Sequence, residues 1–103
     1  MKTSILSNMP REFSSYLRSN AGWLNDFDDN VFSGELGVVK PDARIYEACL
    51  QGLNAIPEQT LFIDDVSVNV EGARALGINA IKFDSVNQLA VEAQAFGLPI
   101  LRV

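Results

Sequence analysis

Short apolar runs alternate with helical patterns along the chain, and this alternation predicts the order of the elements. The clearest strand is Thr60–Ile63, a continuous apolar run that ends at two aspartates. Shorter apolar runs predict three more strands, at Thr3–Ser7, Val31–Ser33 and Ile78–Phe83. Between the strands, apolar residues recur three and four positions apart, as on one face of a helix. Strands that alternate with helices are typical of a parallel α/β sheet covered by helices.

Two local signals support the helices. Asp42 stands where a helix N-cap is expected, and the following helix has an apolar face that includes Ile45 and Leu53. Ser85 and Gln88 have the spacing of a capping box at the start of the last helix. No repeat, linker or low-complexity tract interrupts the pattern. We therefore predict one α/β domain over residues 1–103.

Composition narrows the function classes. Of the 103 residues, 48% are hydrophobic and 20% are charged, which is typical of a globular chain. The net charge is −5, so a nucleic-acid binder that neutralises phosphates is excluded. The sequence contains no histidine. Catalytic triads with histidine and histidine-ligated metals are therefore excluded, and any metal must be a hard cation held by oxygen atoms.

The cell compartment is predicted from cysteine use and from apolar runs. The single Cys49 cannot form an intrachain disulfide, which fits a reducing compartment. No apolar stretch approaches the roughly 20 residues that a membrane span needs, and the first residues make a poor signal peptide. We therefore expect a cytoplasmic protein that does not bind membranes.

Candidate chemistry lies where predicted strands end, because ligands of open α/β sheets bind beyond the carboxyl ends of the strands. Ser7 and Asn8 follow the first strand, Asp64 and Asp65 follow the third, and Lys40 lies in a loop between them. Adjacent carboxylates suit magnesium, which prefers one or two of them together with water and phosphate oxygens. Each residue also has an ordinary interpretation, as a helix cap or a solvated side chain. Together they favour a site for an anion and a divalent cation.

Three segments resemble the haloacid dehalogenase superfamily. They are Ile5–Asn8, Gly37–Tyr46 and Leu61–Ile78, and they are similar to its second, third and fourth motifs in order and spacing. The segments Lys-Pro-Asp-x-x-Ile-Tyr and Asp-Asp-x-x-x-Asn-Val-x-x-Ala are specific in combination. The pattern is most similar to the phosphatases that resemble the N-terminal domain of soluble epoxide hydrolase. The resemblance implies a partial Rossmann-like, three-layer α/β domain with about four parallel strands.

The resemblance also implies a role for each candidate residue. Ser7 would hydrogen-bond the transferring phosphoryl group, and Asn8 would shape the substrate site beside it. Lys40 would stabilise the nucleophile and the phosphoryl charge. Magnesium would be positioned by Asp64 and Asp65, and Asn69 would support their loop. The acidic pair favours a phosphatase over a dehalogenase, acting on a small phosphorylated molecule.

The first motif of the superfamily has no counterpart in this sequence. That motif, Asp-x-Asp-x-Thr/Val, supplies the nucleophile and the general acid and base on a central strand. The only similar segment, Asp26-Phe27-Asp28, follows no predicted strand, so we reject it. The cap domain is also absent. We therefore predict that the central strand is missing and that the chain is the C-terminal part of a core domain.

Two functions are consistent with a sequence that has the later motifs of the superfamily but not the first. The first is the C-terminal portion of a magnesium-dependent phosphate-monoester hydrolase. The isolated chain would then be inactive for lack of the nucleophilic aspartate, and an N-terminal complementing segment or self-association would fill the gap. The alternative is a non-catalytic binding or interaction module that retains an anion- and metal-binding groove.

Overall fold

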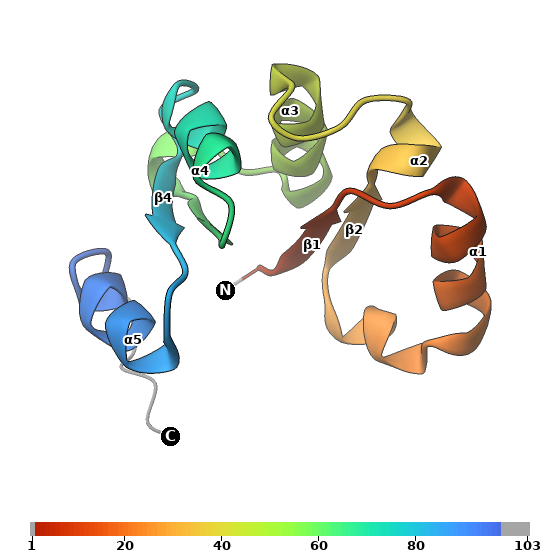
Figure 1. Ribbon diagram of the computed structural model, residues 1–103, viewed down its shortest axis with the longest axis horizontal. Coiled ribbons are helices and arrows are strands. Elements are labelled where there is room, and N and C mark those ends of the chain that lie inside the picture. Colours follow the sequence, from red (N-terminus) through yellow and green to blue (C-terminus); the bar gives the residue numbers. More distant parts are fainter. Residues whose placement is uncertain (1, 98–103) are drawn as a thin grey trace. The chain divides into compact units, whose positions relative to one another are not determined.

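The computed structural model describes residues 2–97 and divides the chain into two compact units, residues 1–56 and 57–103 (Figure 1). Each unit contains one pair of parallel strands with its helices. Four parallel strands in an α/β chain confirm the predicted fold class. No helix in the described part of the chain is long and apolar enough to cross a membrane.

The first unit is built around strands β1 and β2. Strand β1 (Ser4–Ser7) pairs in parallel with β2 (Asp29–Phe32), so that Ser7 lies opposite Phe32. The remaining elements of this unit, in chain order, are α1 (Arg11–Asn20), the 3-10 helix η1 (Gly22–Asp26), α2 (Ser33–Leu36) and α3 (Ala43–Leu53).

The second unit repeats this plan with β3 (Leu61–Asp64) and β4 (Asn79–Lys82), again parallel, with Asp64 opposite Lys82. Its other elements are η2 (Pro57–Gln59), α4 (Ser67–Arg74) and α5 (Val86–Gln94). The described strands thus form two separate parallel pairs, β1–β2 and β3–β4.

The second strand differs from its prediction. Val31–Ser33 was expected, whereas β2 spans Asp29–Phe32 and Ser33 is the first residue of α2. Ser33 turns away from the strand because its hydroxyl accepts a hydrogen bond from Met9 N (2.8 Å) and donates one to Met9 O (3.2 Å). The other three strands lie within one residue of the predicted ends. The short apolar stretch at the end of the sequence, Pro99–Val103, lies outside the described residues.

Both units have a buried apolar interior. In the first, Phe32, Ile45 and Tyr46 are 1% exposed or less, and α3 packs on β2. The interior of the second comes from α4, β4, α5 and Ile78, the residue before β4, and the other buried apolar residues are Val70, Ala73, Ala80, Ile81, Ala90 and Ala93. Helix α1 forms as predicted, but Phe13 and Tyr16 on its apolar face are exposed. An apolar spacing therefore predicted the helix without predicting its buried side.

The two predicted helix caps are present. The Asp42 carboxylate accepts a hydrogen bond from Arg44 N at 2.9 Å at the start of α3. At the start of α5, the Ser85 hydroxyl accepts from Gln88 N, and the Gln88 side chain accepts from Ser85 N. Both caps satisfy backbone groups that the first turn of a helix leaves unpaired.

Candidate functional site

The end of β1 and the loop before α3 are joined through one side chain. Asn8 Oδ1 accepts a hydrogen bond from Lys40 N at 2.9 Å, and Asn8 Nδ2 donates to Lys40 O at 3.4 Å. The Asn8 amide thus holds both backbone groups of Lys40, although the two residues are 32 positions apart. Three of the six residues predicted for the site, Ser7, Asn8 and Lys40, therefore belong to one small region of the first unit.

The turn after β1 is held against the start of α2. Besides the two hydrogen bonds of Ser33, Gly34 N donates to Met9 O at 3.0 Å. A Cβ at position 34 would lie 2.7 Å from Met9 O and closer still to Arg11 N. Only glycine therefore allows α2 to approach the turn this closely.

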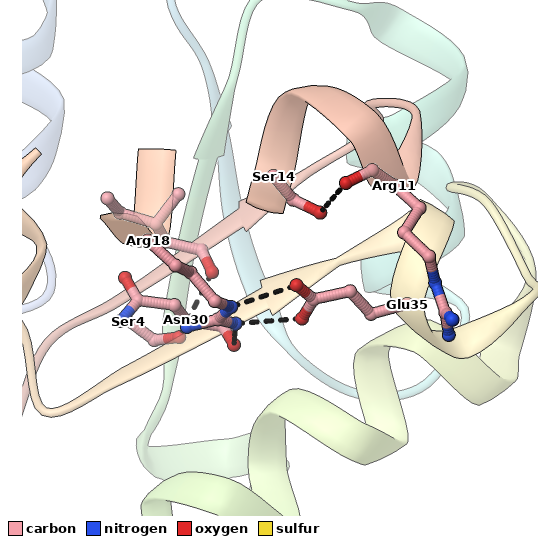
Figure 2. Close-up of polar contacts among 7 residues, drawn as sticks. Ser4, Arg11, Ser14, Arg18, Asn30 and Glu35 are labelled. Carbon is pink, nitrogen blue, oxygen red and sulfur yellow. Dashed lines mark hydrogen bonds and ion pairs between the residues drawn. The ribbon is translucent and has the colours of Figure 1, made fainter. Parts of the chain in front are cut away.

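An ion pair connects α1 with α2 (Figure 2). Arg18 Nε and Nη2 each donate to one carboxylate oxygen of Glu35 at 2.8 Å, and the guanidinium lies 4.8 Å from the centre of the Phe32 ring. Hydrogen bonds from Arg18 hold the pKa of Glu35 below its ordinary value. This two-point contact fixes α2, which is only four residues long and leads into the Lys40 loop.

Asp42 follows the Lys40-Pro41 peptide, which is cis. The Arg44 guanidinium donates to both carboxylate oxygens of Asp42, at 2.9 and 3.1 Å. These bonds, together with the backbone bond from Arg44, lower the pKa of Asp42 from 3.8 to about 2. The carboxylate therefore stays charged at the start of α3, where a negative charge is favourable.

The Asp42 contacts predict a pH-dependent contribution to stability. A lowered pKa means that the stabilisation is complete above pH about 4 and is lost as the pH falls toward 2. The Asp42→Asn variant keeps a cap but has no charge. We expect thermal unfolding to show a higher midpoint for the parent chain than for Asp42→Asn at neutral pH. The difference should vanish near pH 2, and a constant difference would contradict the assignment.

The acidic residues lie at the end of β3 in the second unit. Asp64 Oδ1 accepts from Val66 N at 2.9 Å, and Asp64 Oδ2 accepts from Asn69 Nδ2 at 3.2 Å. Asn69 is buried, whereas Asp65 is exposed. No side chain caps the start of α4, so the interpretation of an aspartate as a helix cap is wrong, and Asp64 instead accepts from the N–H of Val66, the residue before the helix. The same contacts orient its carboxylate at the strand end.

The donor chemistry of this strand end fits magnesium but forms no complete protein cage. The described residues contain no group of three or more histidine, cysteine, aspartate or glutamate side chains that could hold a metal ion. Magnesium commonly uses only one or two carboxylates and takes its other ligands from water and substrate phosphate. Asp64 and Asp65 supply two carboxylates at this strand end, and that they bind magnesium together stays a prediction.

The predicted site residues thus form two sets, one in each unit. Ser7, Asn8 and Lys40 belong to the first, and Asp64, Asp65 and Asn69 belong to the second. That the two sets form one site stays a prediction. Sequence reasoning missed the supporting contacts of Arg18 with Glu35 and of Ser33 with Met9. These pairs are 17 and 24 positions apart, and no local spacing indicates them.

Comparison with known proteins agrees with the motif pattern. The family profile of haloacid dehalogenase-like hydrolases matches residues 1–77. The chain is 34% identical to the mouse (Mus musculus) acyl-CoA dehydrogenase family member 10 over 97% of its own length and 9% of that protein. It is 34% identical to a Mycobacterium tuberculosis phosphatase, over 85% of this chain and 41% of the relative. It is 32% identical to rat (Rattus norvegicus) bifunctional epoxide hydrolase 2, over 78% of this chain and 13% of that protein.

Solved structures show the same fold. An uncharacterised protein from Corynebacterium glutamicum superposes with a TM-score of 0.81 and 28% identity, over 94% of this chain and 72% of that one. An enzyme of the same family from Bacteroides thetaiotaomicron, in complex with magnesium and inorganic phosphate, gives a TM-score of 0.68 and 28% identity. The match covers 79% of this chain and 44% of that enzyme. The chain thus spans less than half the length of the curated relatives named above.

Proposed function

Because the chain belongs to the haloacid dehalogenase-like hydrolase family, we propose that it forms part of a magnesium-dependent phosphatase core that acts on a small phosphate monoester. The observation that carries the proposal is the pair of hydrogen bonds from Asn8 to the backbone of Lys40, which holds the lysine loop at the end of β1. The similarity to a mycobacterial phosphatase supports the choice of phosphate ester as substrate.

Each residue has a role in this proposal. The Ser7 hydroxyl donates a hydrogen bond to a phosphoryl oxygen, and the Lys40 ammonium offsets the negative charge that develops there. Asp64 and Asp65 hold magnesium, and Asn69 keeps the Asp64 carboxylate oriented. When bound, the ion neutralises phosphate charge and so lowers the barrier to phosphoryl transfer. The Bacteroides relative, crystallised with magnesium and phosphate, supports this assignment.

The nucleophile in this proposal comes from another segment. Asp26-Phe27-Asp28, the one similar sequence, lies at the end of η1 and before β2, so it follows no strand in the structure either. An N-terminal segment with the Asp-x-Asp-x-Thr/Val motif would supply both the attacking carboxylate and a further magnesium ligand. The proposed partners are therefore such a segment and the phosphorylated substrate.

Calorimetry separates this proposal from a non-catalytic binding module. A catalytic part that lacks one magnesium ligand should bind magnesium and inorganic phosphate weakly when alone, and more tightly once the N-terminal segment is added. A binding module should give the same affinity with and without that segment. Asp65→Asn should weaken the magnesium response, whereas the control Asp84→Asn, at an exposed aspartate in the same unit, should leave it unchanged. Equal affinities with and without the segment would contradict the catalytic proposal.

A further inference from the structure

A pocket of about 490 Å³ lies in the first unit, beside the Lys40 loop. Its walls are the turn after β1 (Asn8–Pro10), the first two residues of α2, and Gly37 and Val39 in the loop that follows α2. The pocket is shallow and mostly open to solvent, so it would cover one side of a small ligand group. All of these segments belong to one compact unit, so the pocket does not depend on the second unit.

The pocket lining offers a ligand mainly apolar surface. It contains no charged side chain, and its two polar side chains, Asn8 and Ser33, already bond to the protein backbone. The surface left for a ligand comes mainly from Met9, Pro10 and Val39 together with glycine backbone. A ligand group with its own charge or several hydroxyls would lose water here without gaining partners.

The pocket walls are held firmly. Contacts of Ser33 and Gly34 with Met9 join two of these walls, and the Arg18–Glu35 ion pair connects α2 with α1. Gly37 ends α2 in a left-handed conformation with φ of 80°, and a Cβ there would meet nothing within 4 Å. The space beside Gly37 is therefore open and available to a ligand.

The position of the pocket connects it with the proposed phosphate site. Asn8 lines the pocket and also bonds both backbone groups of Lys40. The lining residues Asn8 and Val39 directly neighbour Ser7 and Lys40 in the sequence, so a phosphoryl group held by Ser7 and Lys40 would lie beside the pocket. Resting on the proposed function, we propose that this pocket binds the leaving group of the phosphate ester, and that this group is an apolar alcohol or a phenol.

The test uses two probes that report on the pocket and on the phosphate site separately. Phenol, which carries no phosphate, should shift the backbone amide NMR signals of Gly34, Gly37 and Val39 in the full chain, while glycerol should not. Val39→Asp places a charge on the pocket wall and should weaken phenol binding by roughly tenfold or more. The matched control Val91→Asp changes another exposed valine, on α5, and should bind phenol like the parent. Equal binding of phenol by Val39→Asp and the parent, or shifts scattered away from the pocket, would overturn the proposal.

A second titration links the pocket to the substrate. Phenyl phosphate with magnesium should bind more tightly than glycerol phosphate with magnesium, and Val39→Asp should remove that preference. A phenol response without any response of Lys40 or Asp65 to inorganic phosphate and magnesium would overturn the proposed function and leave only an apolar pocket. A phosphate response with no preference for phenyl phosphate would overturn the leaving-group assignment alone.

Discussion

The isolated 103-residue chain should release no phosphate above background from a generic aryl phosphate in the presence of magnesium. Phosphomonoester hydrolysis is among the slowest uncatalysed reactions, and positioned acid and base groups typically contribute a factor of about 10²–10⁴. Lys40, Ser7 and magnesium would still polarise a phosphate. Water would nevertheless have to attack without a positioned base.

Adding the N-terminal segment with the Asp-x-Asp-x-Thr/Val motif, either fused or in trans, should restore turnover. Lys40→Ala and Asp65→Asn should each lower the restored rate by at least about 10²-fold, because each removes charge stabilisation of the phosphoryl group. Lys82→Ala and Asp84→Asn are the matched controls. These two residues are exposed, and Lys82 Nζ forms an ion pair with Asp84 Oδ1 at 3.8 Å, so neither has a role in the proposed site. Both controls should retain the restored rate. The assay is phosphate release at saturating magnesium.

A different nucleophile would give a different result. Turnover by the isolated chain that disappears in Asp65→Asn would show that the attacking group lies within these residues. The segment Asp26–Asp28 would then be the first candidate, although the Asp28 carboxylate accepts a hydrogen bond from Thr3 N.

Phe32→Ala should strongly destabilise the first unit. The Phe32 side chain is 1% exposed at the end of β2 and lies under the guanidinium of Arg18. Removing a fully buried aromatic ring typically costs about 3–5 kcal/mol, which is a large part of the total stability of a small domain. Urea unfolding followed by circular dichroism should therefore show a much lower midpoint.

Phe13→Ala is the matched control for this experiment. Phe13 has the same side chain but is 51% exposed on α1, so its removal should change the free energy of unfolding by less than about 1 kcal/mol. Equal losses for the two variants would mean that the ring of Phe32 is not the centre of this interior.

Features that depend on near neighbours could be predicted from the sequence. The strand that ends at Asp64 follows from a continuous apolar run, and the caps at Asp42 and Ser85 follow from residues two or three positions away. The motif pattern around Lys40 and Asp64 identified the family, which the family profile and the relatives confirm. Such signals are local, so the order of the amino acids is enough to carry them.

Features that depend on distant neighbours were decided only by tertiary structure. Ser33 directly follows the apolar pair Val31 and Phe32 in the sequence and is predicted to belong to their strand, yet it begins α2, and Met9, 24 positions earlier, offers both a donor and an acceptor to its hydroxyl. Phe13 is apolar and correctly spaced but exposed, because periodicity records which face of a helix is apolar and not what packs against it. The bonds from Asn8 to Lys40 span 32 positions and have no periodic signature. The sequence by itself therefore determined most of the strands, the caps of α3 and α5 and the candidate residues. Helix α2 and the contacts that position those residues arise only when the chain folds back on itself.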